Sequence, residues 1–600
     1  MRLICQSFNF GECPGFLLSP SLRDTQLRSS ISTAYSGSPS CQRRTHQLQV
    51  SLRRMQISVF YVLLLSAALV SSSPQVQLHR TTLVGRDITE LKLDFFGGIP
   101  YAEPPLGSLR LLPPKLKSHL NAGFFNASNF GLSCLQPGMS NDLISEDCLT
   151  INILRPSGVT ERSSLPVLFW TFGGGFDSGS ASTFNGSAIV AQSVSRGTPV
   201  IYVNFNYRLG PLGFPQGAEA ASRGILNLAI KDQLAALEWV QMNIGTFGGD
   251  RHKVTVFGES AGSIMTSILF LNPSISKFAR AAIFESGSAT SSLAFNAQRR
   301  EDSWTTFVRG IPSCSSFVGT QFTVNCIRSM NSSDVLEGLL LAFADEDEDI
   351  PFDPTLDGPH GLFPGLPSEL FPRGQFARLP FIAGTNLDEG TAFCPTAVNY
   401  TDELLREILS ANFSPPALPP KVLDELMALY PDDPSAGSPY NTGNETFGLS
   451  PLFKKCAALT GDLMFDSQRR HWIQTASESG VKAFGYRFTQ SLTNNLVPAA
   501  LGVAHSTELE FVYGEVRALN QSAAADALSI AMIDYWVSFA TSLDPNDGRG
   551  SPRPTWPQYT PKHQVLLQLN GANLTVIPDD YNKEKIDFII SEGSVFRHRH

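Results

Sequence analysis

Short runs of apolar residues, rich in β-branched and aromatic side chains, recur along the chain without polar alternation. Such runs are typical of strands buried on both faces, as in a parallel sheet. Between the second and third runs, Leu228, Leu234, Leu237 and Val240 fall near one helical face. The order strand, helix, strand predicts an α/β fold with a parallel sheet. The runs are residues 167–170, 200–203, 254–257, 281–284 and 381–383.

Composition and charge restrict the class of protein and its partners. The 600 residues are 42% hydrophobic and 16% charged, which allows a large core and excludes a disordered or fibrous chain. Residues 1–54 carry a net charge of +5, so the total of −9 leaves −14 for the rest. An acidic body repels phosphate backbones, so we expect no nucleic-acid partner. Pro- and Gly-rich stretches later in the chain do not separate two compositions, which predicts one domain over residues 74–600.

The residues before that domain resemble a secretory leader. Arg53 and Arg54 precede an apolar run at 57–70 and a serine run at 71–73, the order of a signal peptide. Fourteen apolar positions fall short of the roughly 20 that a membrane span needs, although a signal anchor is the alternative. We therefore predict a signal peptide at 55–73 and an extracellular protein. Residues 1–54 are interpreted as an over-extended reading frame or a disordered arm.

Cysteines and glycosylation motifs agree with an oxidising compartment. Cys134 and Cys148, and likewise Cys314 and Cys326, are close in sequence, as expected of loop-closing disulfides. The state of Cys394 and Cys456 is open. Eight Asn-x-Ser/Thr motifs are glycosylation candidates: Asn126, Asn185, Asn331, Asn399, Asn412, Asn444, Asn520 and Asn573.

A G-x-S-x-G motif at residues 258–262 follows the apolar run at 254–257, and an apolar helical stretch at 264–271 comes next. This context is typical of a nucleophile elbow, whose strained turn exposes the Ser260 hydroxyl; a plain tight turn is the alternative. A serine that attacks an ester creates an oxyanion, which needs preorganised N–H donors. We expect these from the glycines at 173–175 and from Ala261.

In proteins whose nucleophile lies on such an elbow, the nucleophile, the acid and the histidine follow one another in this order along the chain. His505 lies in a small-residue loop suited to bring an imidazole to a serine, so we predict it as the general base. The acid follows the run at 381–383 in a polar turn, where spacing alone does not separate Asp388 from Glu389. The other downstream histidines lie beside two arginines on an expected surface helix, in a short linker or in the terminal tail: His471, His563, His598 and His600.

Further motifs resemble those of the type-B carboxylesterase and lipase family, over most of the chain from about residue 95. They are GIPYA at 98–102, SEDCL at 145–149, NYRLG at 206–210, FGGD at 247–250, the elbow, DEG at 388–390, and His505 followed by ELEF at 508–511. The resemblance implies the α/β-hydrolase fold, with a large, mostly parallel central sheet flanked by helices. It also implies a Ser260, Glu389 and His505 triad that forms an acyl-enzyme without metal or organic cofactor.

The same resemblance assigns further roles. It implies oxyanion donors at Gly174, Gly175 and Ala261, disulfides Cys134–Cys148 and Cys314–Cys326, and structural ion pairs Arg110–Glu146 and Arg208–Asp232. Within the family the chain resembles fungal lipases, sterol esterases and carotenoid-ester lipases. A cholinesterase fits less well, because no tryptophan lies between Cys134 and Cys148 to bind a quaternary ammonium. Only thirteen residues separate these cysteines, which predicts a short lid and no sharp activity jump at lipid aggregation.

Together these observations predict a secreted carboxylic ester hydrolase that acts on apolar, long-chain acyl esters. Its expected partner is a small-molecule ester or lipid, met in a transient contact with a lipid interface. The alternatives are a noncatalytic adhesion homologue of the same fold and a short-chain or aromatic-ester carboxylesterase. The oligomeric state and the alcohol specificity are open.

Overall fold

A mixed β-sheet forms the centre of the fold. The computed structural model describes residues 73–292, 294–344, 350–411, 418–493 and 496–596, and among these the sheet has 11 strands in the order β14-β13-β12-β11-β10-β9-β7-β8-β6-β4-β3. The pairs from β8 to β13 are parallel, and antiparallel pairs extend the sheet at both ends. A second sheet pairs β1, β2 and β5. The strand bounds are β1 Gln75–Leu78, β2 Thr81–Val84, β3 Arg86–Ile88, β4 Leu93–Pro100, β5 Phe124–Asn126, β6 Thr150–Pro156, β7 Leu165–Thr171, β8 Ile201–Phe205, β9 Gly249–Glu259, β10 Ala281–Glu285, β11 Phe381–Asn386, β12 Ala483–Phe488, β13 Val565–Leu569 and β14 Thr575–Pro578.

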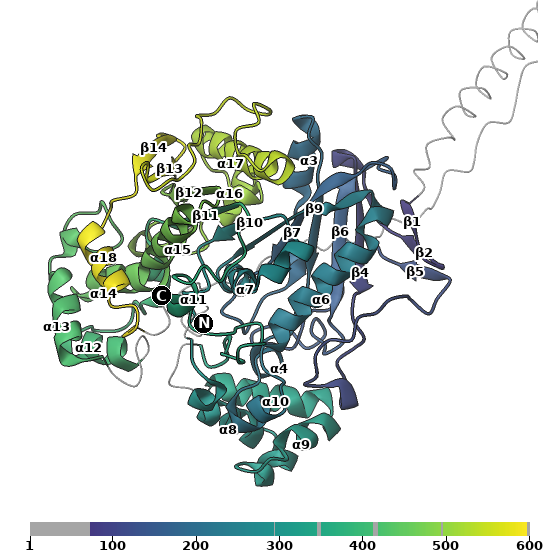
Figure 1. Cartoon of the computed structure of the whole chain (residues 1–600), viewed down its shortest axis with the longest axis horizontal. Coiled ribbons are helices and arrows are strands. Elements are labelled where there is room, and N and C mark those ends of the chain that lie inside the picture. The colour runs from purple at the N-terminus through teal and green to yellow at the C-terminus, as the bar shows by residue number, and fades with distance from the viewer. Residues whose placement is uncertain (1–72, 293, 345–349, 412–417, 494–495, 597–600) are drawn as a thin grey trace, which may run out of the picture. The chain divides into compact units, whose positions relative to one another are not determined.

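The five apolar runs coincide with strands β7 to β11, and the predicted α/β-hydrolase architecture is confirmed. Strands β8, β10 and β11 are buried at every position, because helices cover the sheet and leave no face for polar alternation. The predicted helices at 227–244 and 264–271 are α6 and α7. Figure 1 shows both lying across the sheet. A parallel sheet brings the carboxyl ends of β9, β10 and β11 to one edge, where the segments that follow them meet.

Helices flank the sheet in groups. α6 contacts α7, and α3 contacts α17, while α15 packs on β11 and β12. α17 is apolar enough to cross a membrane, but 72% of its apolar window is buried, as in the core helix of a folded protein. The helix bounds are α3 Ser187–Ser195, α4 Gly210–Gly213, α5 Gly217–Ser222, α6 Leu228–Asn243, α7 Ala261–Phe270, α8 Glu301–Arg309, α9 Thr323–Ser329, α10 Ser332–Ala344, α11 Pro367–Leu370, α12 Asp402–Ala411, α13 Pro420–Leu429, α14 Phe453–Gly461, α15 Ser467–Glu478, α16 Leu509–Val512, α17 Ala523–Ser542 and α18 Lys583–Ser591.

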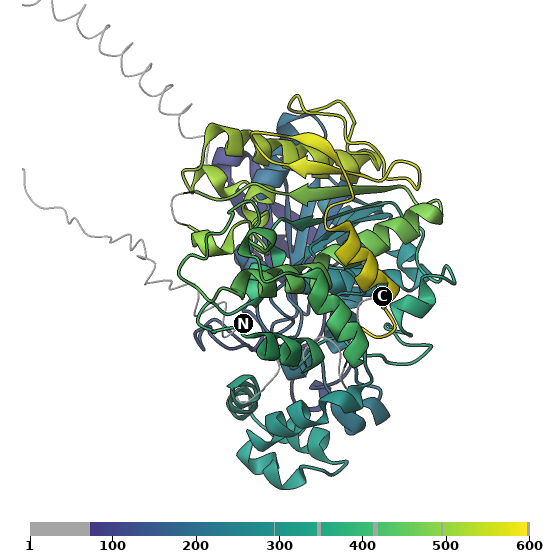
Figure 2. The ribbon, with the colours of Figure 1, turned by 90° about the vertical axis from the view of Figure 1, so that its left-hand side faces the viewer.

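Two helical lobes lie below and beside the sheet. Helices α8, α9 and α10 group together at the bottom of Figure 1, and Figure 2 shows the same group from the side. Helices α12, α13, α14 and α18 form the other lobe, with α13 in contact with α12 and α18. The residues from Pro74 onward belong to one compact unit, and a second unit, Phe8–Ser73, lies almost wholly outside the described residues. The predicted extension at 1–54, nearly all of the signal peptide at 55–73 and Asn412 also fall outside them.

The disulfides predicted from the family resemblance are present. Cys134–Cys148 and Cys314–Cys326 have S–S distances of 2.02 and 1.96 Å. A third disulfide, Cys394–Cys456, joins residues 62 positions apart, which the sequence left open. All three close loops of the chain and reduce the conformational entropy of the unfolded state.

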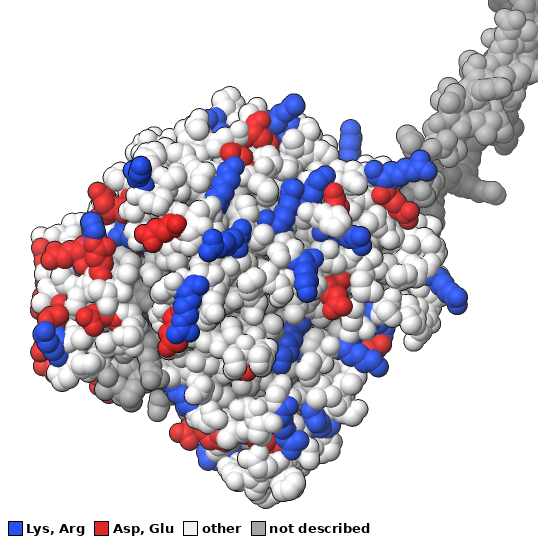
Figure 3. Space-filling view, viewed as in Figure 1, with Lys and Arg blue, Asp and Glu red and all other residues white. Residues whose placement is uncertain are grey.

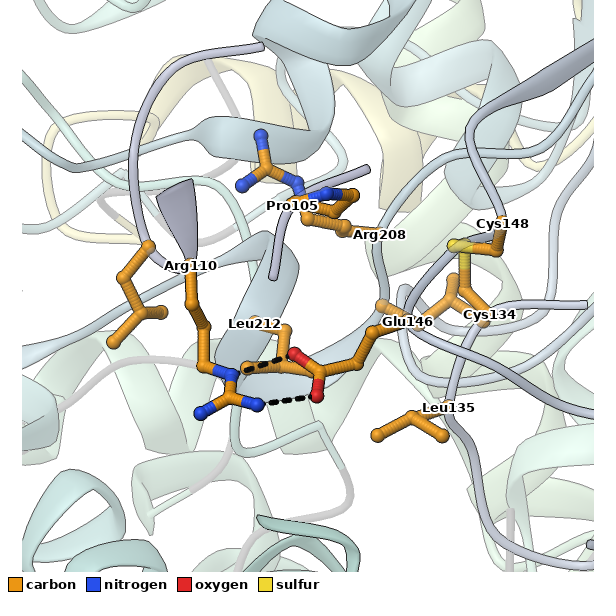
Figure 4. Close-up of a pocket in the computed structure, with 10 residues that line it drawn as sticks. Pro105, Arg110, Cys134, Leu135, Glu146, Cys148, Arg208 and Leu212 are labelled. Atoms are coloured by element: carbon orange, nitrogen blue, oxygen red, sulfur yellow. Dashed lines mark hydrogen bonds and ion pairs between the residues drawn. A yellow bond between two sulfur atoms is a disulfide. The ribbon is translucent and has the colours of Figure 1, made fainter. Parts of the chain in front are cut away.

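The two predicted structural ion pairs are buried and bidentate. Arg110 donates to both carboxylate oxygens of Glu146 at 2.7 Å, and Arg208 donates to those of Asp232 at 2.8 and 2.7 Å. Figure 4 shows the Arg110–Glu146 pair beside the Cys134–Cys148 disulfide, around a cavity of about 10 Å³. Such a cavity is at the lower limit for one water molecule, so these charges are architectural.

Candidate active site

Ser260 lies at the sharp turn between β9 and α7. Its backbone has φ 53° and ψ −129°, a conformation that residues other than glycine rarely adopt. Its N–H donates to the carbonyl of Glu285 at 3.0 Å. A Cβ on Gly262 would lie 2.1 Å from the carbonyl oxygen of Thr171, so only glycine allows β7 this close to the turn. This is the geometry of a nucleophile elbow, and Ser260 is partly exposed there.

The glycine loop predicted to hold the oxyanion lies directly beside the elbow. A Cβ on Gly173 would lie 2.8 Å from the Cβ of Ser260, and Gly174 has φ 100°. The carbonyl of Gly174 accepts from the N–H of Ser178 at 3.1 Å, and among the described residues no acceptor bonds the N–H of Gly174 or Gly175. The N–H of Ala261 begins α7, where no helical carbonyl can accept it. The N–H groups of Gly174, Gly175 and Ala261 therefore form no hydrogen bond with any described residue, and the glycine loop that carries two of them passes beside the serine.

His505 and Glu389 are brought into direct contact from segments that follow different strands. The imidazole Nδ1 lies 2.5 Å from Oε2 of Glu389. The other oxygen, Oε1, accepts from the hydroxyl of Ser286 at 2.6 Å and from the N–H of Asn386 at 2.7 Å. Glu389 is 1% exposed, so its carboxylate oxygens bond to protein groups and not to solvent. When the imidazole is neutral, this contact fixes the tautomer that carries its hydrogen on Nδ1 and leaves Nε2 free of hydrogen.

Asp388, which spacing could not separate from Glu389, has a different role in the structure. Its Oδ1 accepts from the hydroxyl of Ser438 at 2.9 Å and from the N–H of Tyr440 at 2.8 Å. Its Oδ2 accepts from the N–H of Val503 at 2.9 Å. Asp388 therefore ties the histidine loop to the acid turn, and of these two adjacent carboxylates only Glu389 forms a hydrogen bond with the imidazole.

The remaining nitrogen of His505 faces the elbow but forms no hydrogen bond with any described residue. Nε2 lies 3.2 Å from Oε1 of Glu259, the residue immediately before Ser260. That oxygen also accepts from the hydroxyl of Ser506 at 2.5 Å. No hydrogen bond joins Ser260 to His505 among the described residues, as is common for catalytic groups in the absence of substrate.

The charges around His505 oppose the effect of its burial. Burial alone would lower the pKa of the imidazole, but the carboxylates of Glu259 and Glu389 outweigh it and raise the pKa to about 9. Burial raises the pKa of Glu259, although His505 opposes this. Burial, with Glu259 and Glu389, raises the pKa of Glu508 to about 8. The site thus stabilises an imidazolium strongly, and protons are shared among the neighbouring carboxyl groups.

The sequence predicts Ser260, Glu389 and His505 as the triad but gives no indication of Glu259 and Ser286, which contact its predicted base and acid. Glu259 occupies the first variable position of the G-x-S-x-G motif, and the motif assigns no chemical role to that position. Ser286 follows β10 and has φ 49°, which the sequence does not reveal. Glu259 ends β9 and Ser286 directly follows β10, which lies between β9 and the acid strand β11, so the shared carboxyl edge of these parallel strands is the one signal that could have indicated them.

Comparison with known families supports the same interpretation. The sequence model described as the Carboxylesterase family matches residues 72–589. The chain belongs to the carboxylesterase family. Carboxylesterases and lipases of this family are its relatives by sequence and by structure, and the protein is accordingly a carboxylic ester hydrolase.

Relatives of this carboxylesterase include fungal lipases. Lipase 2 of Geotrichum candidum is 32% identical over 576 residues, which cover 87% of this chain and 97% of that lipase. Secreted lipase 1 of Botryotinia fuckeliana is 33% identical, covering 83% of this chain and 89% of the lipase. The structure of Aspergillus niger EstA has a TM-score of 0.75 at 24% identity and covers 88% of this chain and 99% of its own.

Proposed function

We propose that this carboxylesterase is a secreted lipase that hydrolyses esters of long apolar acyl chains through Ser260, His505 and Glu389. The observation that carries the proposal is the contact of His505 Nδ1 with the buried Glu389, which leaves Nε2 free and facing the elbow. A base held in one tautomer beside an accessible serine hydroxyl is what acyl transfer requires.

In the acylation step, Nε2 accepts the Ser260 proton as Oγ attacks the ester carbonyl carbon. The carbonyl electrons move to its oxygen, and the amides of Gly174, Gly175 and Ala261 donate to the oxyanion. The imidazolium, stabilised by Glu389, then gives its proton to the departing alcohol oxygen. Removal of one oxyanion donor of this kind costs about 3 kcal/mol of transition-state stabilisation.

In the deacylation step, a water molecule takes the place of the alcohol. Nε2 accepts a proton from the water as its oxygen attacks the acyl-enzyme carbonyl, and the same amides hold the second oxyanion. The imidazolium returns its proton to Ser260 Oγ when the acid leaves. The resting enzyme is restored without any other reactant.

The first disulfide loop supports a lid that moves little. Gln136, inside this loop, donates to the carbonyl of Gly179 and accepts from its N–H, both at 2.9 Å, just after the oxyanion glycines. The loop is therefore fastened at the site and does not form a free amphipathic flap. Hydrolysis of dispersed long-chain esters is expected without a large activity jump at the aggregation threshold.

The long-chain preference rests on the relatives, one of which is described as "Secreted triacylglycerol lipase LIP1" of Gibberella zeae, 33% identical over 84% of this chain. Nitrophenyl esters from acetate to palmitate test it, with Ser260→Ala, His505→Gln and Glu389→Gln as triad variants. We expect kcat/KM to rise with chain length and to collapse in all three variants. A maximum at acetate would favour a short-chain carboxylesterase, and full activity in a triad variant would refute that residue's role.

Secretion and surface chemistry complete the proposal. The sequon asparagines within the described residues are exposed, so glycans can be accommodated at each: Asn126, Asn185, Asn331, Asn399, Asn444, Asn520 and Asn573. Figure 3 shows basic side chains across the middle of the face that α6 and α7 cover and acidic ones gathered toward the lobe of α12 and α13. The expectation that nucleic acid is not a partner rests on the net negative charge of the chain. Amino-terminal sequencing of the protein recovered from the culture medium should give a start near Pro74. Retention of the protein in the cell would contradict secretion.

A further inference from the structure

The imidazole of His505 packs against two phenylalanine rings that also contact each other. Its centroid lies 4.6 Å from that of Phe465 and 5.1 Å from that of Phe393, and the two phenylalanine centroids lie 5.4 Å apart. Phe465 is 3% exposed, so its ring faces the protein interior. We call Phe393 and Phe465 the aromatic brace.

A disulfide connects the two segments that supply the brace. Phe393 ends the 3-10 helix η8, Glu389–Phe393, which begins with the predicted triad acid, and Cys394 follows directly. Cys394 is bonded to Cys456 in α14. That helix continues without a break into the π-helical turn η10, Asp462–Asp466, which presents Phe465. A π-helical turn redirects side chains within a helix and occurs frequently at functional sites.

The hydrogen bond to Glu389 does not by itself fix the imidazole. A single contact through Nδ1 leaves the ring free to tilt about that axis, and a tilt carries Nε2 away from the serine. The nearest group on the other side is Glu259, 3.2 Å from Nε2, and its carboxylate attracts an imidazolium. The rings of Phe393 and Phe465 also contact the imidazole, so they limit how far it can tilt.

We propose that Phe465, together with Phe393, positions the His505 imidazole toward Ser260, and that the Cys394–Cys456 disulfide holds this brace closed. Both residues act through His505 and not on the substrate, so they are positioning residues. The inference rests on the proposed function, because it takes His505 as the general base. Misplacement of a catalytic group by about 1 Å can cost about a hundredfold in rate, so the brace contributes to kcat.

Phe465→Leu tests the brace, with Phe465→Tyr as the variant that restores a ring. Phe453→Leu is the matched control, because Phe453 is 1% exposed and lies in the same continuous helix, in contact with Tyr400. For a soluble nitrophenyl ester, we expect Phe465→Leu to lower kcat about ten- to a hundredfold with KM unchanged. The rate of Ser260 phosphonylation by a small fluorophosphonate should fall in parallel, and Phe465→Tyr should recover most of the loss.

Several outcomes would overturn the brace. The proposal fails if Phe465→Leu retains the native kcat, or if its loss appears in KM and not in kcat. It also fails if Phe453→Leu lowers kcat as much as Phe465→Leu does at an equal loss of thermal stability. His505→Gln separates this failure from that of the proposed function. If His505→Gln is inactive and Phe465→Leu is fully active, only the brace is wrong; if His505→Gln is active, the triad is wrong.

The double variant Cys394→Ser, Cys456→Ser tests the role of the disulfide. We expect a kcat loss at temperatures where the variant is folded by circular dichroism. Adding Phe465→Leu should then cost less than it does in the native enzyme, because the brace is already open and coupled residues are not additive. Strictly additive losses would show that the disulfide stabilises the fold without holding the brace.

Discussion

Replacement of Glu259 by glutamine should move the pH dependence of the enzyme toward acid. The carboxylate oxygen lies 3.2 Å from Nε2 of His505 and is, after the opposing effect of burial, the largest influence on the imidazole pKa, which is raised to about 9. The protonated imidazole cannot accept the serine proton, so activity appears only as the pH rises through that pKa. Removing the charge lowers the pKa, and the active form persists to lower pH.

The size of the shift follows from the distance. At 3.2 Å and an effective dielectric constant of about 20, the Coulomb energy is about 5 kcal/mol, or about four pKa units as an upper limit. Burial raises the pKa of Glu259 itself, so its carboxyl group and the imidazole titrate together and the observed shift falls below this limit. We therefore expect the acid limb of kcat/KM to move down by about one to two units.

The assay is kcat/KM for a soluble nitrophenyl ester between about pH 5 and pH 10, with enzyme integrity checked at each pH. Glu510→Gln is the control, because it removes a half-buried carboxylate whose pKa is raised by burial but which does not influence His505. Its acid limb should stay in place. An acid limb that is unmoved in Glu259→Gln, or that moves to higher pH, would refute the electrostatic account of the base.

Further substitutions separate catalysis from folding. Glu389→Gln should lower kcat/KM about a thousandfold or more with little change in thermal stability, because the amide oxygen can still accept from Ser286 and Asn386 while its NH₂ donates to Nδ1, which holds the imidazole in the tautomer that cannot accept the serine proton. Asp388→Asn should instead cost about 2 kcal/mol of unfolding free energy, since one of its three donors then faces an NH₂ group, and it should retain far more activity. Gly262→Ala should destabilise by about 3 kcal/mol or prevent folding, because its Cβ would lie 2.1 Å from a strand carbonyl oxygen. Thermal denaturation and kinetics on the same preparations check all three, and Asp388→Asn losing as much activity as Glu389→Gln would contradict the division of roles.

The sheet and the elbow could be predicted from the sequence because each gives a local signal. Strands buried on both faces produce continuous apolar runs, so β7 to β11 could be predicted from hydrophobicity. Ser260 is bracketed by glycines that the turn requires on steric grounds. His505 was reached by elimination, and Glu389 was separated from Asp388 only through the family resemblance.

The remaining features depend on contacts between distant segments. The prediction that His471 lies on a surface helix is wrong, because Arg469 and Arg470 beside it are buried and paired with Asp579. From the sequence alone, two adjacent arginines predict a solvent-exposed position. Only the tertiary structure brings Asp579 into contact with them. The Cys394–Cys456 pairing was unreadable for the same reason, since no local pattern links cysteines 62 positions apart.

Covalent labelling shows directly whether Ser260 is the nucleophile. The native enzyme is treated with a fluorophosphonate, digested and mapped by mass spectrometry. One adduct is expected, on Ser260, and it should be absent from a Ser260→Ala variant with an unchanged melting temperature. An adduct on a different serine, or undiminished labelling of the alanine variant, would contradict this role of Ser260.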